Sequence, residues 1–132
     1  MKLFGYYKTF AGAAVILFLS IYPFKPETGQ GFLDIPQLDK AIHFLLYCLF
    51  SLVLCIDLSD KTKKPRKFKI FTVFSVSFLL GVLLELIQHY FIPERSGSIY
   101  DVLANTTGCI LGLFLFYKVP IFLKFHQRFE SL

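Results

Sequence analysis

Four apolar runs, separated by polar and turn-forming residues, organise the chain. The runs cover residues 9–24, 41–56, 70–92 and 102–117. Only the third contains a charged residue, Glu85. A helix that crosses the hydrocarbon core of a bilayer needs about 20 residues, and interfacial aromatic and lysine residues extend the two shorter runs. The pattern predicts an all-α fold, an integral membrane four-helix bundle with helices over about 6–24, 40–57, 69–92 and 100–118.

Composition supports a membrane protein. The chain of 132 residues is 55% hydrophobic and 17% charged, with 17 Phe and 7 Tyr. One small core could not bury this much apolar surface, because small domains bury only about 60–70% of what the unfolded chain exposes. Disorder is excluded. The three cysteines, Cys48, Cys55 and Cys109, lie inside apolar runs and cannot form a complete disulfide framework. We predict one domain over residues 1–132, with the lipid bilayer as its surroundings and no cleaved signal peptide.

Charge predicts the orientation of the helices. Eleven of the fourteen basic residues fall before the first run, between the second and third, or after the fourth. They are Lys2, Lys8, Lys61, Lys63, Lys64, Arg66, Lys67, Lys69, Lys118, Lys124 and Arg128. The positive-inside rule therefore places both termini in the cytoplasm, an N-in/C-in multi-pass topology. The basic link is a short turn between membrane helices, so no nucleic-acid partner is predicted.

Polar residues gather toward the opposite, outer ends of the last three runs. Asp39, His43 and Tyr47 are spaced i, i+4, i+8 and share one helix face. Glu85 lies seven residues before Ile92, about 10 Å below the helix end. An unpartnered charge near the bilayer centre costs at least about 2.5–3.5 kcal/mol, so Glu85 needs a donor or a proton. The candidate ligand-binding residues are Asp39, Lys40, His43, Tyr47, Glu85, Gln88, Arg95, Ser98, Asp101 and Asn105.

Three functions fit this cluster. In the first, it binds an envelope lipid or lipid-linked glycan, with Arg95 and Lys40 pairing with an anionic headgroup. In the second, it is a membrane-embedded enzyme with Glu85 and His43 as acid and base and Asp101 orienting His43 or Arg95. In the third, the polar residues only hold helices together, at about 0.6 kcal/mol per contact. The sequence does not decide whether the chain is an enzyme.

A metal site is a weaker alternative. His43, Glu85, His89 and Asp101 are ligand types for divalent ions. No close ligand pair of the HExxH kind is present among them, so we predict no metal and no cofactor. The stripe Ala104-x-x-x-Gly108-x-x-x-Gly112 is typical of close helix packing.

The polar motifs together resemble a known family. They are Asp39-Lys40-x-x-His43-Phe44-x-x-Tyr47, Glu85-x-x-Gln88 and Arg95-x-x-Ser98-x-x-Asp101-x-x-x-Asn105-x-x-Gly108-x-x-x-Gly112. This pattern, over about residues 35–115, resembles the VanZ-like family of bacterial membrane proteins, named after a teicoplanin-resistance accessory protein. The resemblance implies a polytopic helical protein of the bacterial cell (inner) membrane and cell envelope. It further implies a link to glycopeptide (teicoplanin) antibiotic resistance, and it leaves the reaction and a homo-oligomeric state open.

Overall fold

The computed structural model describes residues 3–21, 38–92, 98–121, 124 and 127–128. These residues form a short 3-10 helix η1 (Leu3–Tyr6) and four α-helices, and contain no strand. The helices are α1 (Tyr7–Ile21), α2 (Leu38–Lys61), α3 (Arg66–Phe91) and α4 (Ile99–Lys118). The all-α prediction is confirmed, and the predicted bounds of the last three helices differ from these by only a few residues. The predicted continuation of the first helix to residue 24 lies outside the described residues.

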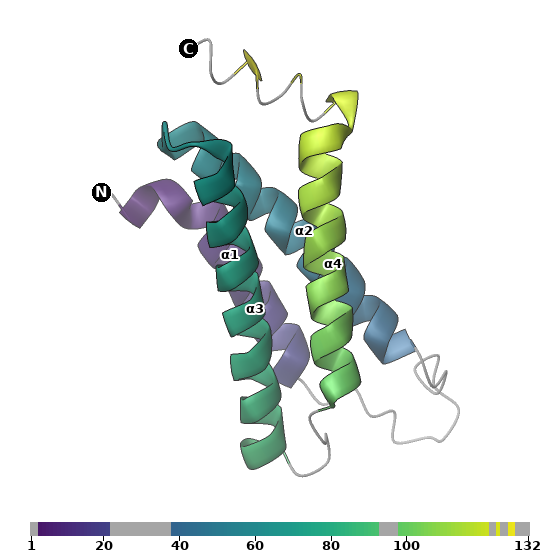
Figure 1. Ribbon diagram of the computed structural model, residues 1–132. Helices are drawn as coiled ribbons and strands as arrows, with labels where there is room; N and C mark the ends of the chain where they lie inside the picture. Colours follow the sequence, from purple (N-terminus) through teal and green to yellow (C-terminus); the bar gives the residue numbers. More distant parts are fainter. Residues whose placement is uncertain (1–2, 22–37, 93–97, 122–123, 125–126, 129–132) are drawn as a thin grey trace.

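Successive helices run in opposite directions along the bundle, so α2 runs parallel to α4 (Figure 1). α2 packs most extensively against α4 and also contacts α1 and α3. We call the end where α2 and α4 begin the site end, and the end where they terminate the basic end. The predicted basic segments at α1, the α2–α3 turn and α4 all belong to the basic end.

Three of the four helices are long and apolar enough to cross a bilayer: Leu38–Ser59 within α2, all of α3 and all of α4. They contain 22, 26 and 20 residues. α1 has 15 residues, so it is about 22 Å long and shorter than the roughly 30 Å hydrocarbon core. The prediction of membrane-spanning length is therefore confirmed for three helices, and α1 is a shorter apolar helix packed beside them.

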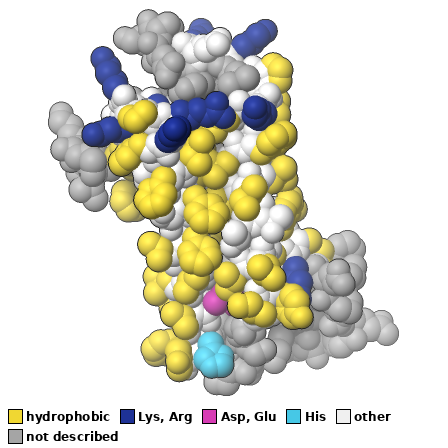
Figure 2. Space-filling view, viewed as in Figure 1, with side chains coloured by type: hydrophobic (Ala, Val, Ile, Leu, Met, Phe, Trp, Pro, Cys, Tyr) yellow, Lys and Arg dark blue, Asp and Glu magenta, His cyan; other side chains and the backbone are white. Residues whose placement is uncertain are grey.

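The surface and interior of the bundle are those of a membrane protein. Large apolar side chains are widely exposed, among them Phe71, Leu79, Phe91 and Phe114, while several polar residues are buried. Figure 2 shows hydrophobic side chains covering the middle of one face, Lys and Arg gathered at the basic end, and a histidine at the site end. An apolar surface of this extent is stable in lipid but costly in water, so the described helices fit a bilayer environment.

Two glycines bring α2 and α4 together. A Cβ added to Gly108 would overlap the Phe44 carbonyl oxygen, and one added to Gly112 would overlap the Ser51 hydroxyl. Only glycine allows the backbones to approach this closely. The small-residue stripe of α4 is therefore a packing surface, as predicted.

The basic end contains a buried carboxylate that the sequence analysis did not single out. Asp57 is 1% exposed. Its Oδ2 accepts hydrogen bonds from the Thr9 backbone N–H at 3.0 Å and from the Thr9 hydroxyl at 2.6 Å. These bonds tie α1 to α2 because both donors lie on α1.

Candidate functional site

The predicted site residues of α2, α3 and α4 converge at the site end. Six are buried: His43, Tyr47, Glu85, Gln88, Asp101 and Asn105. Asp39 is exposed, while Lys40 and Ser98 are half-buried. Arg95 lies outside the described residues. Burying this many polar side chains in an apolar bundle is energetically unfavourable unless each forms a hydrogen bond or ion pair. The groups that each side chain contacts therefore indicate its role.

Gly81 marks the point where the three helices meet. A Cβ added to Gly81 would lie 3.3 Å from Asn105 Nδ2 and 3.5 Å from the Tyr47 hydroxyl. Residues of α2, α3 and α4 therefore reach one depth. The Tyr47 hydroxyl and both amide atoms of Asn105 are buried without a hydrogen-bond partner among the described residues. Buried polar atoms usually have a partner, so these three atoms are an exception among the described residues.

Glu85 connects α3 to the start of α4. Its Oε2 accepts a hydrogen bond from the Ser98 backbone N–H at 3.1 Å. The Ser98 hydroxyl in turn accepts from the Tyr100 backbone N–H at 3.2 Å, which caps α4. The donor that Glu85 requires is thus supplied in part by a backbone group, which side-chain spacing does not reveal.

Gln88 has a structural partner. Its Nε2 donates to the Ser20 carbonyl oxygen at 2.8 Å, from α3 to the last turn of α1. The bond holds the end of the short α1 helix against the bundle. Gln88 was predicted to bind ligand, and in the structure its amide nitrogen is engaged by the protein itself.

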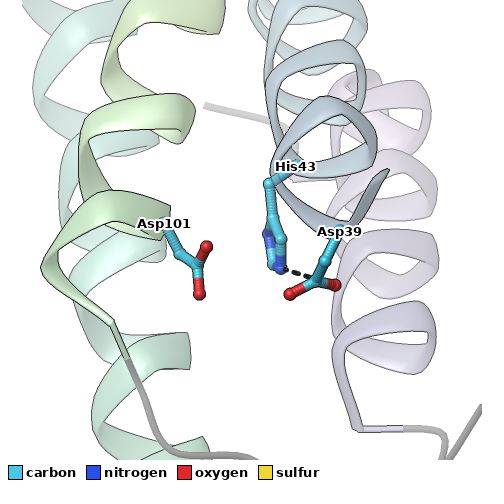
Figure 3. A group of neighbouring side chains, drawn as sticks. All are labelled: Asp39, His43 and Asp101. Carbon is cyan, nitrogen blue, oxygen red and sulfur yellow. Dashed lines mark ion pairs between the residues drawn. The ribbon is translucent and has the colours of Figure 1, made fainter. Parts of the chain in front are cut away.

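His43 lies between two carboxylates (Figure 3). Its Nε2 is 3.8 Å from Asp39 Oδ1 one turn away on α2. Asp101, from the first turn of α4, completes the group, and one ligand atom from each of the three residues lies within 4.8 Å of the others. The structure thus places Asp39 and Asp101 beside His43, whereas the contact described for Glu85 is with Ser98.

An open groove lies between α3 and α4 beside Glu85. Its volume is about 220 Å³. Four apolar side chains and three polar residues line it: Val82, Leu86, Ile99 and Val102, with Glu85, His89 and Ser98. A mostly apolar lining with a few polar groups is typical of ligand-binding sites.

Apolar helices of membrane-spanning length around a buried polar cluster define a polytopic helical membrane protein. The chain belongs to the VanZ/LLP1 family, whose family model matches residues 4–123, and this confirms the predicted resemblance. The chain is also 32% identical over 111 residues to an uncharacterized protein of Schizosaccharomyces pombe, covering 82% of this chain. It spans only 62% of the length of that protein. No solved structure matches the chain.

Proposed function

We propose that the site end binds a membrane lipid or lipid-linked glycan. The observation that carries this proposal is the groove between α3 and α4, where apolar Val82, Leu86 and Val102 lead to the Glu85 carboxylate. An acyl chain fits the apolar wall, because these side chains are as apolar as the surrounding lipid tails and can pack against it. The headgroup then lies beside the polar cluster.

The polar lining of the groove favours a headgroup rich in hydroxyl groups. A sugar or polyol hydroxyl can donate one hydrogen bond and accept others. It can therefore donate to the Glu85 carboxylate and also bond with Ser98 and His89, the polar residues that line the groove. Pairing of an anionic headgroup with Lys40 and Arg95 remains part of the proposal.

The cellular setting is a separate part of the proposal. The excess of Lys and Arg at the basic end supports a cytoplasmic location for that end and an outer-leaflet location for the site. A relative in a fungus indicates that similar chains occur outside bacteria. Lipid binding does not depend on a bacterial envelope, whereas a role in teicoplanin resistance at the bacterial inner membrane does.

Native mass spectrometry of protein purified from its own membrane tests lipid binding. We expect a co-purifying lipid or glycolipid of defined mass. Val102→Phe fills the groove and should lose this ligand. Leu103→Phe is the matched control, because Leu103 is the next residue on α4 and is 56% exposed. Glu85→Gln should weaken binding and leave an acceptor for the Ser98 N–H.

The other two functions predict different results. Product formation from the retained lipid, abolished by Glu85→Gln, would support the enzyme with Glu85 and His43 as acid and base. Absence of any retained lipid, with a lower melting temperature in Asn105→Ala, would support a purely structural cluster. Equal lipid retention by the Val102→Phe and Leu103→Phe variants would contradict binding in the groove.

A further inference from the structure

We propose that Asp39, His43 and Asp101 form a binding site for one divalent transition-metal ion at the site end. The sequence predicts no metal, with His43, Glu85, His89 and Asp101 as the alternative ligand set. The structure retains His43 and Asp101 from that set and adds Asp39, so that carboxylates from α2 and α4 lie on either side of the imidazole (Figure 3). This inference is independent of the lipid, because the ion alone is expected to bind.

The geometry is close to that of a three-ligand site. Metal–oxygen and metal–nitrogen bonds of about 2.1 Å in a tetrahedral site place neighbouring donor atoms about 3.4 Å apart. The donor atoms of the three residues lie within 4.8 Å of one another. Rotations of the side chains that move the donor atoms by about 1 Å would close the site around an ion. Asp39 can make such a rotation, since its side chain is 53% exposed.

His43 provides an observation independent of the carboxylates. The residue is 5% exposed, and its Nδ1 is buried with no hydrogen-bond partner among the described residues. A buried imidazole nitrogen normally donates or accepts a hydrogen bond. A histidine that binds a metal through one ring nitrogen usually donates a hydrogen bond through the other. Metal binding would therefore give both ring nitrogens of His43 a role.

Charge also favours a cation here. Asp101 is 6% exposed, and the two carboxylates offer anionic oxygen ligands of the kind that divalent ions bind. The exposed Asp39 side chain provides a route from solvent to the buried ligands, which any metal site requires.

The ligand types indicate which ions fit. One imidazole with two carboxylates suits Zn²⁺ or Mn²⁺, whereas Mg²⁺ and Ca²⁺ prefer sites made of oxygen ligands alone. Three protein ligands leave a coordination position open to water or to an oxygen of a bound molecule.

The test is equilibrium binding of Zn²⁺ to chelator-stripped full-length protein in detergent, purified without a polyhistidine tag. We expect one Zn²⁺ per chain. Asp101→Asn and His43→Gln should each weaken binding at least about tenfold, because loss even of a residue that only supports a ligand costs 10–100-fold. His89→Gln and Glu85→Gln are the controls, because they change an exposed histidine and a buried carboxylate at the same end of the bundle. Both variants should bind Zn²⁺ as tightly as the wild type does.

Mg²⁺ at the same concentration should not displace Zn²⁺. If Asp101→Asn or His43→Gln does not yield monodisperse protein, Asp39→Asn decides, because Asp39 is exposed and its loss should leave the fold intact. The proposal is overturned by saturable binding that is equal in wild type, Asp39→Asn and His89→Gln, which would indicate adventitious zinc. Absence of stoichiometric Zn²⁺ binding to the wild type would overturn it as well.

Discussion

Replacing Gly108 with alanine should destabilise the bundle, although the same change usually stabilises a helix. Within a helix, alanine is favoured over glycine by about 0.8–1.0 kcal/mol. At this position, however, the added Cβ would overlap the Phe44 carbonyl oxygen. Overpacking typically costs about 1–3 kcal/mol, and the upper end applies here because a backbone carbonyl cannot rotate away. The net loss of stability should be about 2 kcal/mol.

The matched control is Gly12→Ala in α1. A Cβ added to Gly12 would lie 3.3 Å from Cδ2 of the Phe50 ring, so the ring needs to move by only a few tenths of an ångström. This variant should be between neutral and about 1 kcal/mol more stable than wild type. Unfolding by SDS in mixed micelles, followed by the near-ultraviolet circular dichroism of tyrosine, measures both. Equal unfolding midpoints for Gly108→Ala and Gly12→Ala would refute the proposed backbone contact.

The same titration tests three further contacts. Thr9→Val should cost about 1.5–3 kcal/mol, because it removes a hydrogen bond to the buried Asp57 carboxylate; unchanged stability would contradict a role for this bond. Gln88→Met should cost about 1 kcal/mol through loss of the bond to the Ser20 carbonyl oxygen, and a neutral result would show that the bond adds nothing. Ser98→Ala should cost about 0.5–2 kcal/mol through loss of the α4 cap, whereas Ser98→Thr should retain most of the wild-type stability.

The sequence predicts the helices and the side of α2 that faces the cluster. Apolar runs of sufficient length predict helices, because every backbone polar group in lipid must be satisfied within the segment. The spacing of His43 and Tyr47 predicts that they share a face, and both are buried. These features depend only on local periodicity, which a single sequence contains.

The partners across helices could not be predicted in the same way. Which carboxylate lies beside His43 depends on the rotation and crossing of α2 and α4, so the sequence could not distinguish Asp101 from Glu85. Asp57 was overlooked because charged residues are ordinary at the end of a membrane helix. Its partner Thr9 lies 48 residues away in the chain, and no local spacing connects the two.

The packing of α2 on α4 also explains why the polar cluster has space. The helices are closest where Gly108 meets Phe44 and where Gly112 meets Ser51. Asp101 lies seven residues before Gly108, about 10 Å nearer the site end. α2 passes α4 at an angle (Figure 1), and toward that end the side chains of His43 and Asp101 lie between the two helices (Figure 3). A close glycine contact in the middle of the bundle thus determines the distance between the two helices at the site, so the stripe of small residues and the polar cluster form one structural unit.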